Sequence, residues 1–270
     1  MKILFYCPYW GMEHLSYTEA ARRVKAAGYD GMEIAVWDNK YDEAAQAVKE
    51  HDLDLILMAF SMGDTFDEMK QNYRAWLQKA ASYHPRLINS HTGKDWYSFE
   101  QNGELIQVAM EVQQQTGVMV LHETHRGRLT YSAPAMQPYL EAFPDLRLTA
   151  DFSHWVNVAE SYLNDQAENV QRAIQRTDLI HSRVGHPQGP QVNDPRAPEW
   201  QEALDVHLTW WDAILEMHRQ KGTDTLTITC EFGPAPGYLP TLPYTNLPVA
   251  SQWDINLYMK ELLSKRYNGD

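Results

Sequence analysis

Short β-rich runs alternate regularly with helical stretches along this chain, and the alternation limits the folds that it can adopt. Eight runs rich in β-branched and aromatic residues recur along the 270 residues, and a helical pattern follows each of them. The average unit of 270/8, about 34 residues, has the length that a strand, a crossover helix and two turns require. The predicted strands cover residues 2–7, 31–36, 54–60, 86–91, 117–123, 146–151, 178–183 and 226–231.

Three of the stretches between the strands begin with a helix-start signal. Residues 16–19, 65–68 and 98–101 each place a hydroxyl side chain three residues before Glu or Gln, which is the capping-box pattern. Gly28 stands where the first predicted helix should stop. Eight strand and helix units close a barrel, whereas the alternative, an open doubly wound sheet, usually has fewer strands. We therefore predict an α/β fold in which residues 1–270 form a single (β/α)8 TIM barrel domain.

Composition limits the classes of function. The hydrophobic content of 44% is enough for a packed core and does not fit a disordered chain. Thirty-six acidic against 23 basic residues give a formal charge of −13, which disfavours binding to nucleic acid or to an anionic membrane surface. Two cysteines, Cys7 and Cys230, provide no disulfide framework and no cysteine-based zinc module. We expect both to be buried thiols.

The amino-terminal segment does not read as a secretory signal. Its apolar run ends at Pro8 without a cleavage pattern. Elsewhere no apolar run approaches the roughly 20 residues that span a bilayer. These observations predict a cytoplasmic protein without a membrane or nucleic-acid partner.

Proline is concentrated in the segments that follow the last two predicted strands. Four of the 14 prolines lie in residues 187–198 and five lie in residues 234–248. Because proline lowers the entropy that a long loop loses when it is ordered, we expect these segments to form shaped walls over the C-terminal mouth of the barrel. Extended surface connections are the alternative.

A metal-ligand residue type ends each of the last four predicted strands. Alternate residues of a barrel strand face the interior, and functional groups gather at the C-terminal strand ends. The last inward positions hold Glu123, Asp151, His181 and Glu231. Three carboxylates and one imidazole suit one divalent metal ion: Mn²⁺, Co²⁺, Mg²⁺ or Zn²⁺. A structural ion cluster, neutralised in part by Arg183, is the alternative.

With these residues the sequence resembles the xylose isomerase-like TIM barrel superfamily, which includes sugar phosphate isomerases and epimerases, ketose 3-epimerases and family 2 AP endonucleases. The most specific parts are the four ligand-type residues, the Asp-Phe-Ser-His run at 151–154 and the Gly-Tyr-Asp-Gly-Met-Glu run at 28–33. The resemblance covers essentially the whole chain. It implies one divalent metal ion held by Glu123, Asp151, His181 and Glu231, with His154 close to the substrate.

The resemblance also implies a reaction. In the related epimerases the two glutamate ligands form an acid-base pair, so Glu123 and Glu231 are the expected catalytic residues, in either order. A metal ion that polarises a hydroxy-ketone acidifies the neighbouring C–H bond and stabilises the enediolate. We expect a sugar isomerase or epimerase of carbohydrate metabolism that acts on a ketose, hydroxy-ketone or related polyol by proton transfer. His154 and Arg183 would polarise substrate oxygens, with orientation of Asp151 as the alternative role of His154.

Aromatic residues just past the strand ends support a sugar-like ligand. Trp10, Trp37, Trp96 and Trp155 follow the first, second, fourth and sixth strands, where their rings would line the mouth and stack on C–H faces. Filling of the core is the alternative for such large side chains.

Basic residues lie beyond two of the strand ends. Lys94, Arg126 and Arg128 would hold a phosphate or carboxylate of the substrate, or else are solvated loop charges. The residues predicted to bind substrate are His154, Arg183, His91, Trp10, Trp155, Lys94 and Arg126.

Other activities on the same barrel stay open. An apurinic endonuclease is disfavoured because residues 57–64 lack the expected histidine, residues 194–196 read Asp-Pro-Arg in place of Asp-x-His, and the net charge repels DNA. A hydride-shift aldose-ketose isomerase normally needs a second metal ion, for which Asp194 is the only candidate ligand identified in the sequence. An inosose-type dehydratase and a non-catalytic sugar-binding relative are the remaining alternatives.

The sequence does not specify the oligomeric state. Trp200, Trp210 and Trp211 lie on or near one predicted helix. They would either cover the interface of a homo-oligomer or pack this helix on the barrel.

Overall fold

The computed structural model describes residues 1–269 and shows a closed barrel of eight parallel strands, as predicted. Strand order follows the chain, and β8 pairs with β1 to close the barrel. The predicted strand positions are confirmed, with ends that differ by up to three residues. The strands are β1 Lys2–Pro8, β2 Gly31–Ile34, β3 Asp54–Phe60, β4 Leu87–His91, β5 Val120–Glu123, β6 Leu148–Ala150, β7 Thr177–His181 and β8 Thr225–Thr229.

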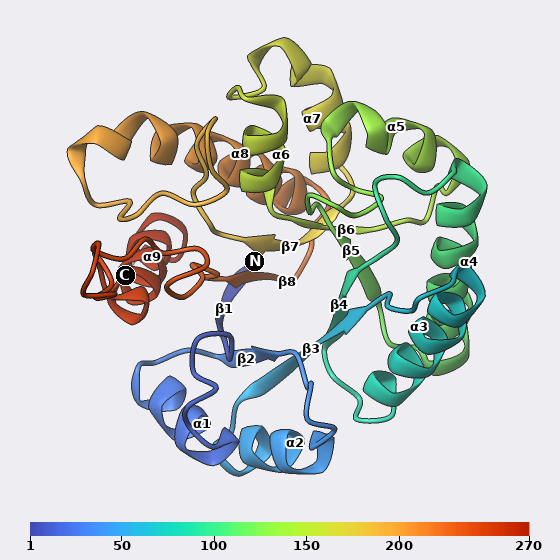
Figure 1. Ribbon diagram of the computed structural model, residues 1–270, viewed down its shortest axis with the longest axis horizontal. Helices are drawn as coiled ribbons and strands as arrows, with labels where there is room; N and C mark the ends of the chain where they lie inside the picture. Colours follow the sequence, from blue (N-terminus) through green and yellow to red (C-terminus); the bar gives the residue numbers. More distant parts are fainter. Residues whose placement is uncertain (270) are drawn as a thin grey trace.

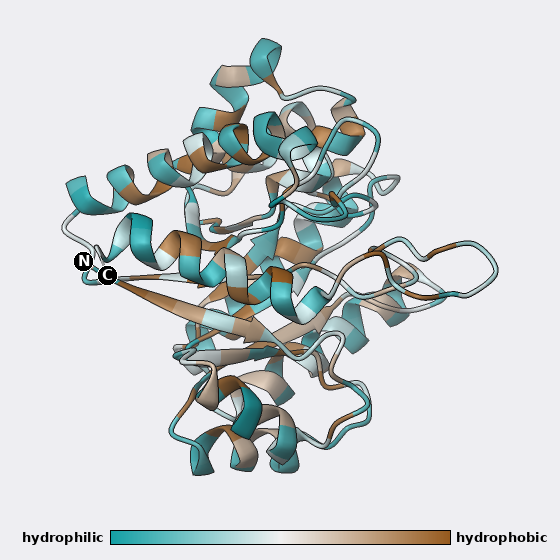
Figure 2. Ribbon diagram, turned by 90° about the vertical axis from the view of Figure 1, so that its left-hand side faces the viewer, coloured by the Kyte–Doolittle hydropathy of each residue, from teal (hydrophilic) through white to brown (hydrophobic). Residues whose placement is uncertain are grey.

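Helices surround the strands (Figure 1). Their sides that face the strands carry many of the apolar residues, and polar residues face outward (Figure 2). The helices are α1 Tyr17–Ala26, α2 Tyr41–Glu50, α3 Phe66–Ala81, α4 Phe99–Thr116, α5 Ala133–Ala142, α6 Phe152–Ala159, α7 Ala167–Ile174, α8 Gln201–Gln220 and α9 Gln252–Tyr267, with short 3₁₀ turns η1 Asn164–Gln166 and η2 Pro198–Trp200.

The predicted helix starts are present, with one difference in detail. Ser16 and Ser98 form complete capping boxes at α1 and α4. Thr65 caps α3 through its hydroxyl, but Glu68 accepts a hydrogen bond from the backbone N–H of Asp64 rather than that of Thr65. Local hydroxyl and carboxylate side chains therefore set where these three helices begin.

The unit after β6 departs from the predicted pattern of one helix per strand. It contains α6 and α7, and α6 begins directly after Asp151. The Asp151 carboxylate accepts a hydrogen bond from the backbone N–H of Ser153 at 3.2 Å, so it caps this helix. This cap fixes the Asp151 side chain at the mouth of the barrel.

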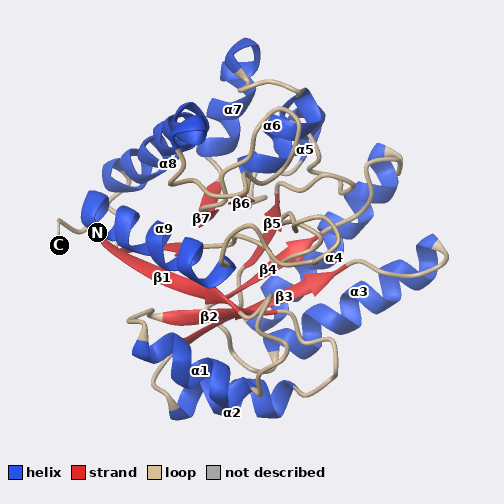
Figure 3. Ribbon diagram, turned by 60° about the vertical axis from the view of Figure 1, so that its left-hand side comes forward, coloured by secondary structure: helices blue, strands red, loops and turns tan. Residues whose placement is uncertain are grey.

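Long loops follow β7 and β8, as the proline distribution predicted. They cover residues 182–197 and 230–251. Gln191 joins the two loops, since its side chain accepts from the N–H of Gly233 at 2.7 Å and donates to the Gly233 carbonyl at 3.2 Å. The chain termini lie at the opposite end of the strands (Figure 3).

An apolar plug fills the lower interior of the barrel. Its buried members are Leu4, Tyr6, Ile56, Leu87, Leu121 and Leu179. Because side chains alternate along a strand, the residue two positions after three of these leucines also faces inward, one layer higher. These three residues are Asn89, Glu123 and His181. The plug therefore supports a polar layer at the C-terminal end of the strands.

The two cysteines and the tryptophans of α8 contribute to the packing of the barrel. Cys7 and Cys230 are buried free thiols, as predicted. Trp211 is buried in the core, and Trp200 and Trp210 are partly buried against it, so these rings help pack α8 and its start on the barrel. No helix within residues 1–269 is long and apolar enough to cross a membrane.

Gly31 offers a test of the packing at the lower end of the barrel. A Cβ atom there would lie 2.3 Å from the Tyr6 ring and 2.5 Å from the Asp54 carbonyl oxygen, whereas a Cβ at Gly237 would meet nothing within 4 Å. Gly31→Ala should lower the free energy of unfolding by about 1–3 kcal/mol, the usual cost of overpacking, and Gly237→Ala should leave it nearly unchanged. Denaturant titration of both variants measures this difference. Equal stability of the two variants would show that Tyr6 and Asp54 move aside without a loss in the free energy of unfolding.

Candidate metal centre

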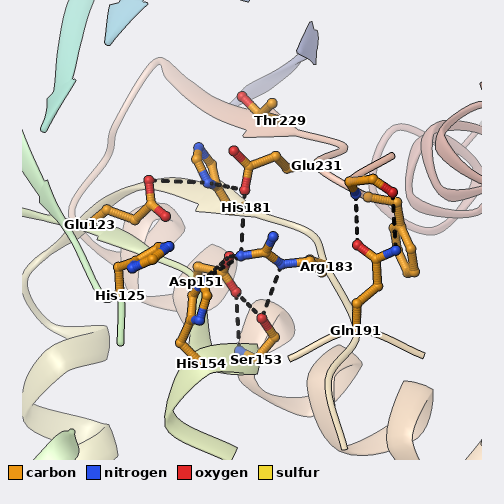
Figure 4. Close-up of polar contacts among 12 residues, drawn as sticks. Glu123, His125, Asp151, Ser153, His154, His181, Arg183, Gln191, Thr229 and Glu231 are labelled. Carbon is orange, nitrogen blue, oxygen red and sulfur yellow. Dashed lines mark hydrogen bonds and ion pairs between the residues drawn. The ribbon is translucent and has the colours of Figure 1, made fainter. Parts of the chain in front are cut away.

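The four side chains predicted as metal ligands meet above the apolar plug. Glu123 and His181 end β5 and β7, Asp151 follows β6, and Glu231 lies two residues after β8. One ligand atom from each residue lies within 4.8 Å of the ligand atoms of the other three, and all four residues are buried. Figure 4 shows the Glu123 and Glu231 carboxylates on either side of His181. The structure thus brings together residues that are up to 108 positions apart in the sequence, from 123 to 231.

His181 presents one ring nitrogen to these carboxylates. Its Nδ1 lies 2.9 Å from Glu231 Oε2 and 3.6 Å from Glu123 Oε2, yet it makes no well-directed hydrogen bond. Its Nε2 lies 3.0 and 3.1 Å from the two Glu33 oxygens. A proton held on Nε2 by Glu33 leaves the Nδ1 lone pair directed at the centre, which is how an imidazole binds a metal ion.

The pKa of His181 reflects the same surroundings. Burial alone would lower it, but Glu231, Glu33 and Glu123 raise the pKa of His181 well above its ordinary value. The carboxylates therefore favour a positive charge at this point, and a divalent cation can supply it in place of a second ring proton. Both the orphaned nitrogen and the donor set fit a divalent metal ion.

Glu33 and its partners form a layer beneath the centre that the sequence analysis did not identify as functional. Glu33 is buried on β2 and accepts hydrogen bonds from Thr229 Oγ1 at 2.6 Å and Asn89 Nδ2 at 2.9 Å. Asn89 also donates to Glu123 Oε2 at 2.7 Å. These bonds orient His181 and Glu123. The sequence feature that could have identified Glu33 is its position as a lone carboxylate inside the apolar run GMEIAV.

Arg183 is the buried arginine of the site. Its Nη2 donates to Asp151 Oδ2, its Nε donates to Ser153 Oγ at 3.2 Å, and Nη2 lies 3.8 Å from Glu231 Oε2. Burial raises the pKa of Asp151 to about 6, although Arg183 opposes this shift. Arg183 thus compensates part of the negative charge, as the ion-cluster alternative requires. It does not compensate all four buried carboxylates.

A cavity of about 210 Å³ lies above this centre. Glu33, Glu123, Arg183 and Glu231 contribute to its polar side. This volume is below the range of about 300–1,000 Å³ of drug-sized ligand pockets, so it favours a compact ligand. Its aromatic and apolar side is formed by Pro8, Tyr9, Trp10, Ala35, Trp37, Met58, Phe60 and Tyr238.

Three of the predicted substrate-binding residues, His91, Arg183 and Trp10, line this cavity. His91 ends β4, and its Nε2 lies 2.9 Å from Glu123 Oε2. His154 is fully buried and is not part of the cavity wall. Its Nε2 lies 2.5 Å from Arg183 Nη2 and 3.8 Å from Asp151 Oδ2, a position that suits the alternative role of orienting these two groups.

The expectation for Trp155 is wrong. This ring does not line the mouth but is fully buried, stacked on Phe152 at 4.9 Å between ring centroids, with its N–H donating to the Thr130 carbonyl at 2.7 Å. The start of α6 directly after β6 turns the ring into the core. Among the other tryptophans, Trp37 lines the cavity, while Trp96 is 73% exposed and lies outside its wall.

The basic loop residues also lie outside the cavity wall. Lys94 and Arg128 are partly buried, and neither reaches the cavity. Arg126 donates to Asn157 Oδ1 at 3.3 Å, and its guanidinium lies 5.5 Å from the centre of the Tyr238 ring, which lines the cavity. Lys94 and Arg126 are not among the residues that line this cavity, so their contact with the substrate stays a prediction.

His125 is a cavity residue that the sequence analysis left without a role. Its ring lies between the His91 ring, 4.4 Å away, and the His154 ring, 3.8 Å away. Burial, together with the neighbouring His91, holds the pKa of His125 well below its ordinary value, so this imidazole is neutral. The sequence feature that could have identified His125 is its position two residues after Glu123, which places it on the same inward face.

Three solved structures illustrate the proteins that this chain is similar to. The 3-keto-D-glucoside 4-epimerase YcjR from E. coli is 15% identical, with a TM-score of 0.67 over 98% of this chain and 100% of that chain. The zinc-bound IOLI protein is 14% identical, with a TM-score of 0.66 over 98% and 99%. The probable 3-DHS dehydratase AsbF from Bacillus anthracis is 16% identical, with a TM-score of 0.64 over 97% and 99%.

At these identities the similarity establishes the fold alone, and the matching structures also include endonucleases. No curated protein matches the chain. The family model described as xylose isomerase-like TIM barrel matches residues 21–244. The chain therefore belongs to the xylose isomerase-like TIM barrel family.

Proposed function

We propose that this protein is a divalent-metal-dependent sugar isomerase or epimerase that moves a proton next to the carbonyl of a ketose, hydroxy-ketone or related polyol. The observation that carries the proposal is the pair Glu123 and Glu231. Both carboxylates line the same cavity and flank His181 Nδ1, at 3.6 and 2.9 Å. Two carboxylates on different sides of a bound substrate can remove a proton and return one.

The surroundings of Glu123 hold its carboxylate in a fixed position beside the cavity. Asn89 Nδ2 donates to Glu123 Oε2 at 2.7 Å, and His91 Nε2 lies 2.9 Å from the same oxygen. The other oxygen is left to exchange a proton with a substrate. Glu231, held near Arg183, would exchange the proton on the other side of the substrate.

Glu123, Asp151, His181 and Glu231 would hold the divalent ion. When bound, the ion supplies polarisation of the hydroxy-ketone oxygens and compensation of the negative charge that develops on them. Mn²⁺, Co²⁺, Zn²⁺ and Mg²⁺ are the candidates, because three carboxylates and one imidazole accept hard and borderline ions. The zinc atom bound by the IOLI protein, which has the same fold, supports a divalent ion of this kind.

The cavity supports a small and uncharged substrate. Its wall carries four carboxylates, Glu13, Glu33, Glu123 and Glu231, against one arginine. An anionic sugar would meet net negative charge there, and the loop cations lie outside the wall. Aromatic rings opposite the carboxylates would stack on the C–H face of a sugar. The same small volume and the formal charge of −13 argue against a DNA substrate.

Dehydration is the second candidate, favoured by the similarity to the 3-DHS dehydratase. It begins with the same proton removal next to a carbonyl and ends with loss of a hydroxyl group. His91, which lines the cavity beside Glu123, is placed to assist that loss. Product analysis separates the two, because an epimer or isomer keeps the mass of the substrate and a dehydrated product loses one water.

Proton exchange in D₂O tests the role of the two carboxylates. The metal-loaded protein, given a panel of free ketoses such as fructose, tagatose and psicose, should place solvent deuterium next to the carbonyl. Glu123→Gln and Glu231→Gln should each slow this exchange by about 10²-fold or more. Glu199→Gln, the same chemical change at an exposed residue outside the cavity, should alter it by less than about threefold. Mass spectrometry measures the deuterium, and metal content is measured for each variant.

Two results of this experiment would contradict the proposal. Unchanged exchange in both Gln variants at full metal content would remove Glu123 and Glu231 from the acid-base role. Turnover without any deuterium incorporation would indicate hydride transfer.

Metal removal gives a separate prediction. Dialysis against a chelator should abolish turnover, and Mn²⁺ or Co²⁺ should restore it. Saturation at 100 times the dissociation constant should also add about 2.7 kcal/mol to the free energy of unfolding. Calorimetry with and without metal measures this gain. Full activity after complete metal removal would rule out the metal-dependent mechanism.

A further inference from the structure

We propose that Lys94 and Arg128 form a binding site for a phosphate group beside the cavity, outside its wall. Lys94 lies in the loop after β4, and Arg128 lies in the loop after β5. A free phosphate ion can occupy this site without any sugar. The inference therefore goes beyond the proposed function and does not depend on it.

Both cations are partly removed from water, and neither has a counter-ion. Nη1 of Arg128 is buried and has no hydrogen-bond partner. Within residues 1–269, neither Lys94 nor Arg128 forms an ion pair, although the chain has 36 acidic residues against 23 basic ones. Because a partly buried charge without a partner is costly, an anion between the two side chains would be favourable.

The two charges also act on each other. Burial lowers the pKa of Lys94, and the charge of Arg128 lowers it further. Burial likewise lowers the pKa of Arg128. The exposed Asp95 raises the pKa of both groups but does not offset these effects. A bound anion would remove the repulsion that the two cations exert on each other.

Hydrogen bonds fix the two loops that carry these side chains. The Leu129 N–H donates to the Thr92 carbonyl at 3.1 Å and so joins the loop after β5 to the loop after β4. The buried Asn102 side chain accepts from the Lys94 N–H at 3.2 Å and donates to the Lys94 carbonyl at 2.9 Å. The backbone of the site is thus preorganised, and binding would order little more than two side chains.

The charges around the cavity explain why an anion would bind beside it and not inside it. Glu123 and Tyr238, which line the cavity, act electrostatically on the Arg128 guanidinium, so the site lies close to the wall. The carboxylates of the wall repel an anion, whereas Lys94 and Arg128 attract one. A guanidinium can donate to two phosphate oxygens at once, and an ammonium group adds a compact positive charge.

Calorimetric titration with inorganic phosphate tests the site. The metal-free full-length protein at low ionic strength should show one saturable site. Lys94→Met and Arg128→Gln should each weaken this binding by about tenfold or more, because each removes a charge-assisted contact. Lys49→Met and Arg22→Gln are the matched controls, because both residues are exposed on helices outside the cavity, and they should change the affinity by less than about twofold.

Chemical labelling gives a readout that needs no variant. Acetylation of amines, followed by mass spectrometry, should show that phosphate protects Lys94 of the unmodified protein. The exposed Lys49 should be labelled equally with and without phosphate. Absence of saturable phosphate binding, full affinity in both Lys94→Met and Arg128→Gln, or equal labelling of Lys94 with and without phosphate would overturn the site.

Competition identifies the source of the phosphate group. If the ligand is a free ion, fructose 6-phosphate should displace inorganic phosphate with no higher affinity than phosphate itself. A higher affinity would support the same site as one for a phosphate group carried on a larger molecule. Deuterium exchange with free ketoses tests the proposed function separately, so failure of the phosphate site would leave that proposal standing.

Discussion

Four carboxylates buried around one imidazole are the arrangement on which the rest of the site depends. Glu33 holds Nε2 of His181, and Glu123 and Glu231 face its Nδ1 from either side. Placing so many like charges together away from water is unfavourable unless positive charge accompanies them. Arg183 supplies part of it through Asp151. A divalent cation among the remaining donors would supply what is missing, and it would explain why His181 keeps a nitrogen without a directed hydrogen bond.

In the barrel, the apolar residues that stabilise the fold lie below the polar residues that form the site. Leucines of the plug occupy the lower inward positions, and Asn89, Glu123 and His181 follow two residues later on the same strands. The apolar residues that stabilise the barrel therefore lie below the site, and the candidate ligand side chains lie at the C-terminal strand ends. Gln191 couples the two proline-rich loops, so the wall above the centre is itself held by hydrogen bonds.

Much of the fold could be predicted because the strand and helix signals are local. A run such as residues 54–60 reads as a strand from its own residues, and the capping box at Ser98 fixes the start of α4 without reference to the rest of the chain. The assembly of Glu123, Asp151, His181 and Glu231 follows from strand alternation and closure. Glu33 could not be recognised in this way, because its importance comes from Thr229 and His181, far away in the sequence.

The wrong prediction for Trp155 also has a physical cause. Trp155 follows a strand, which suggested a place at the mouth, but Asp151 caps a helix at once and the helix turns this ring into the core. The position of a side chain relative to a strand end does not determine where it points when a helix begins there. Arg126 shows the same dependence on distant residues, because its guanidinium lies near the Tyr238 ring of another loop. Loop residues are set by contacts that a linear pattern does not contain.

Membership in this family does not select a reaction, since proteins of different activity share the barrel. Whichever reaction it is, we infer that the four side chains at the strand ends share a cation. X-ray diffraction from crystals grown with Mn²⁺, recorded near the manganese absorption edge, can locate that ion. We expect an anomalous peak within bonding distance of Glu123, Asp151, His181 and Glu231 together. A saturated crystal with no peak among these four residues, or with His181 Nδ1 bonded only to protein, would rule out a shared cation.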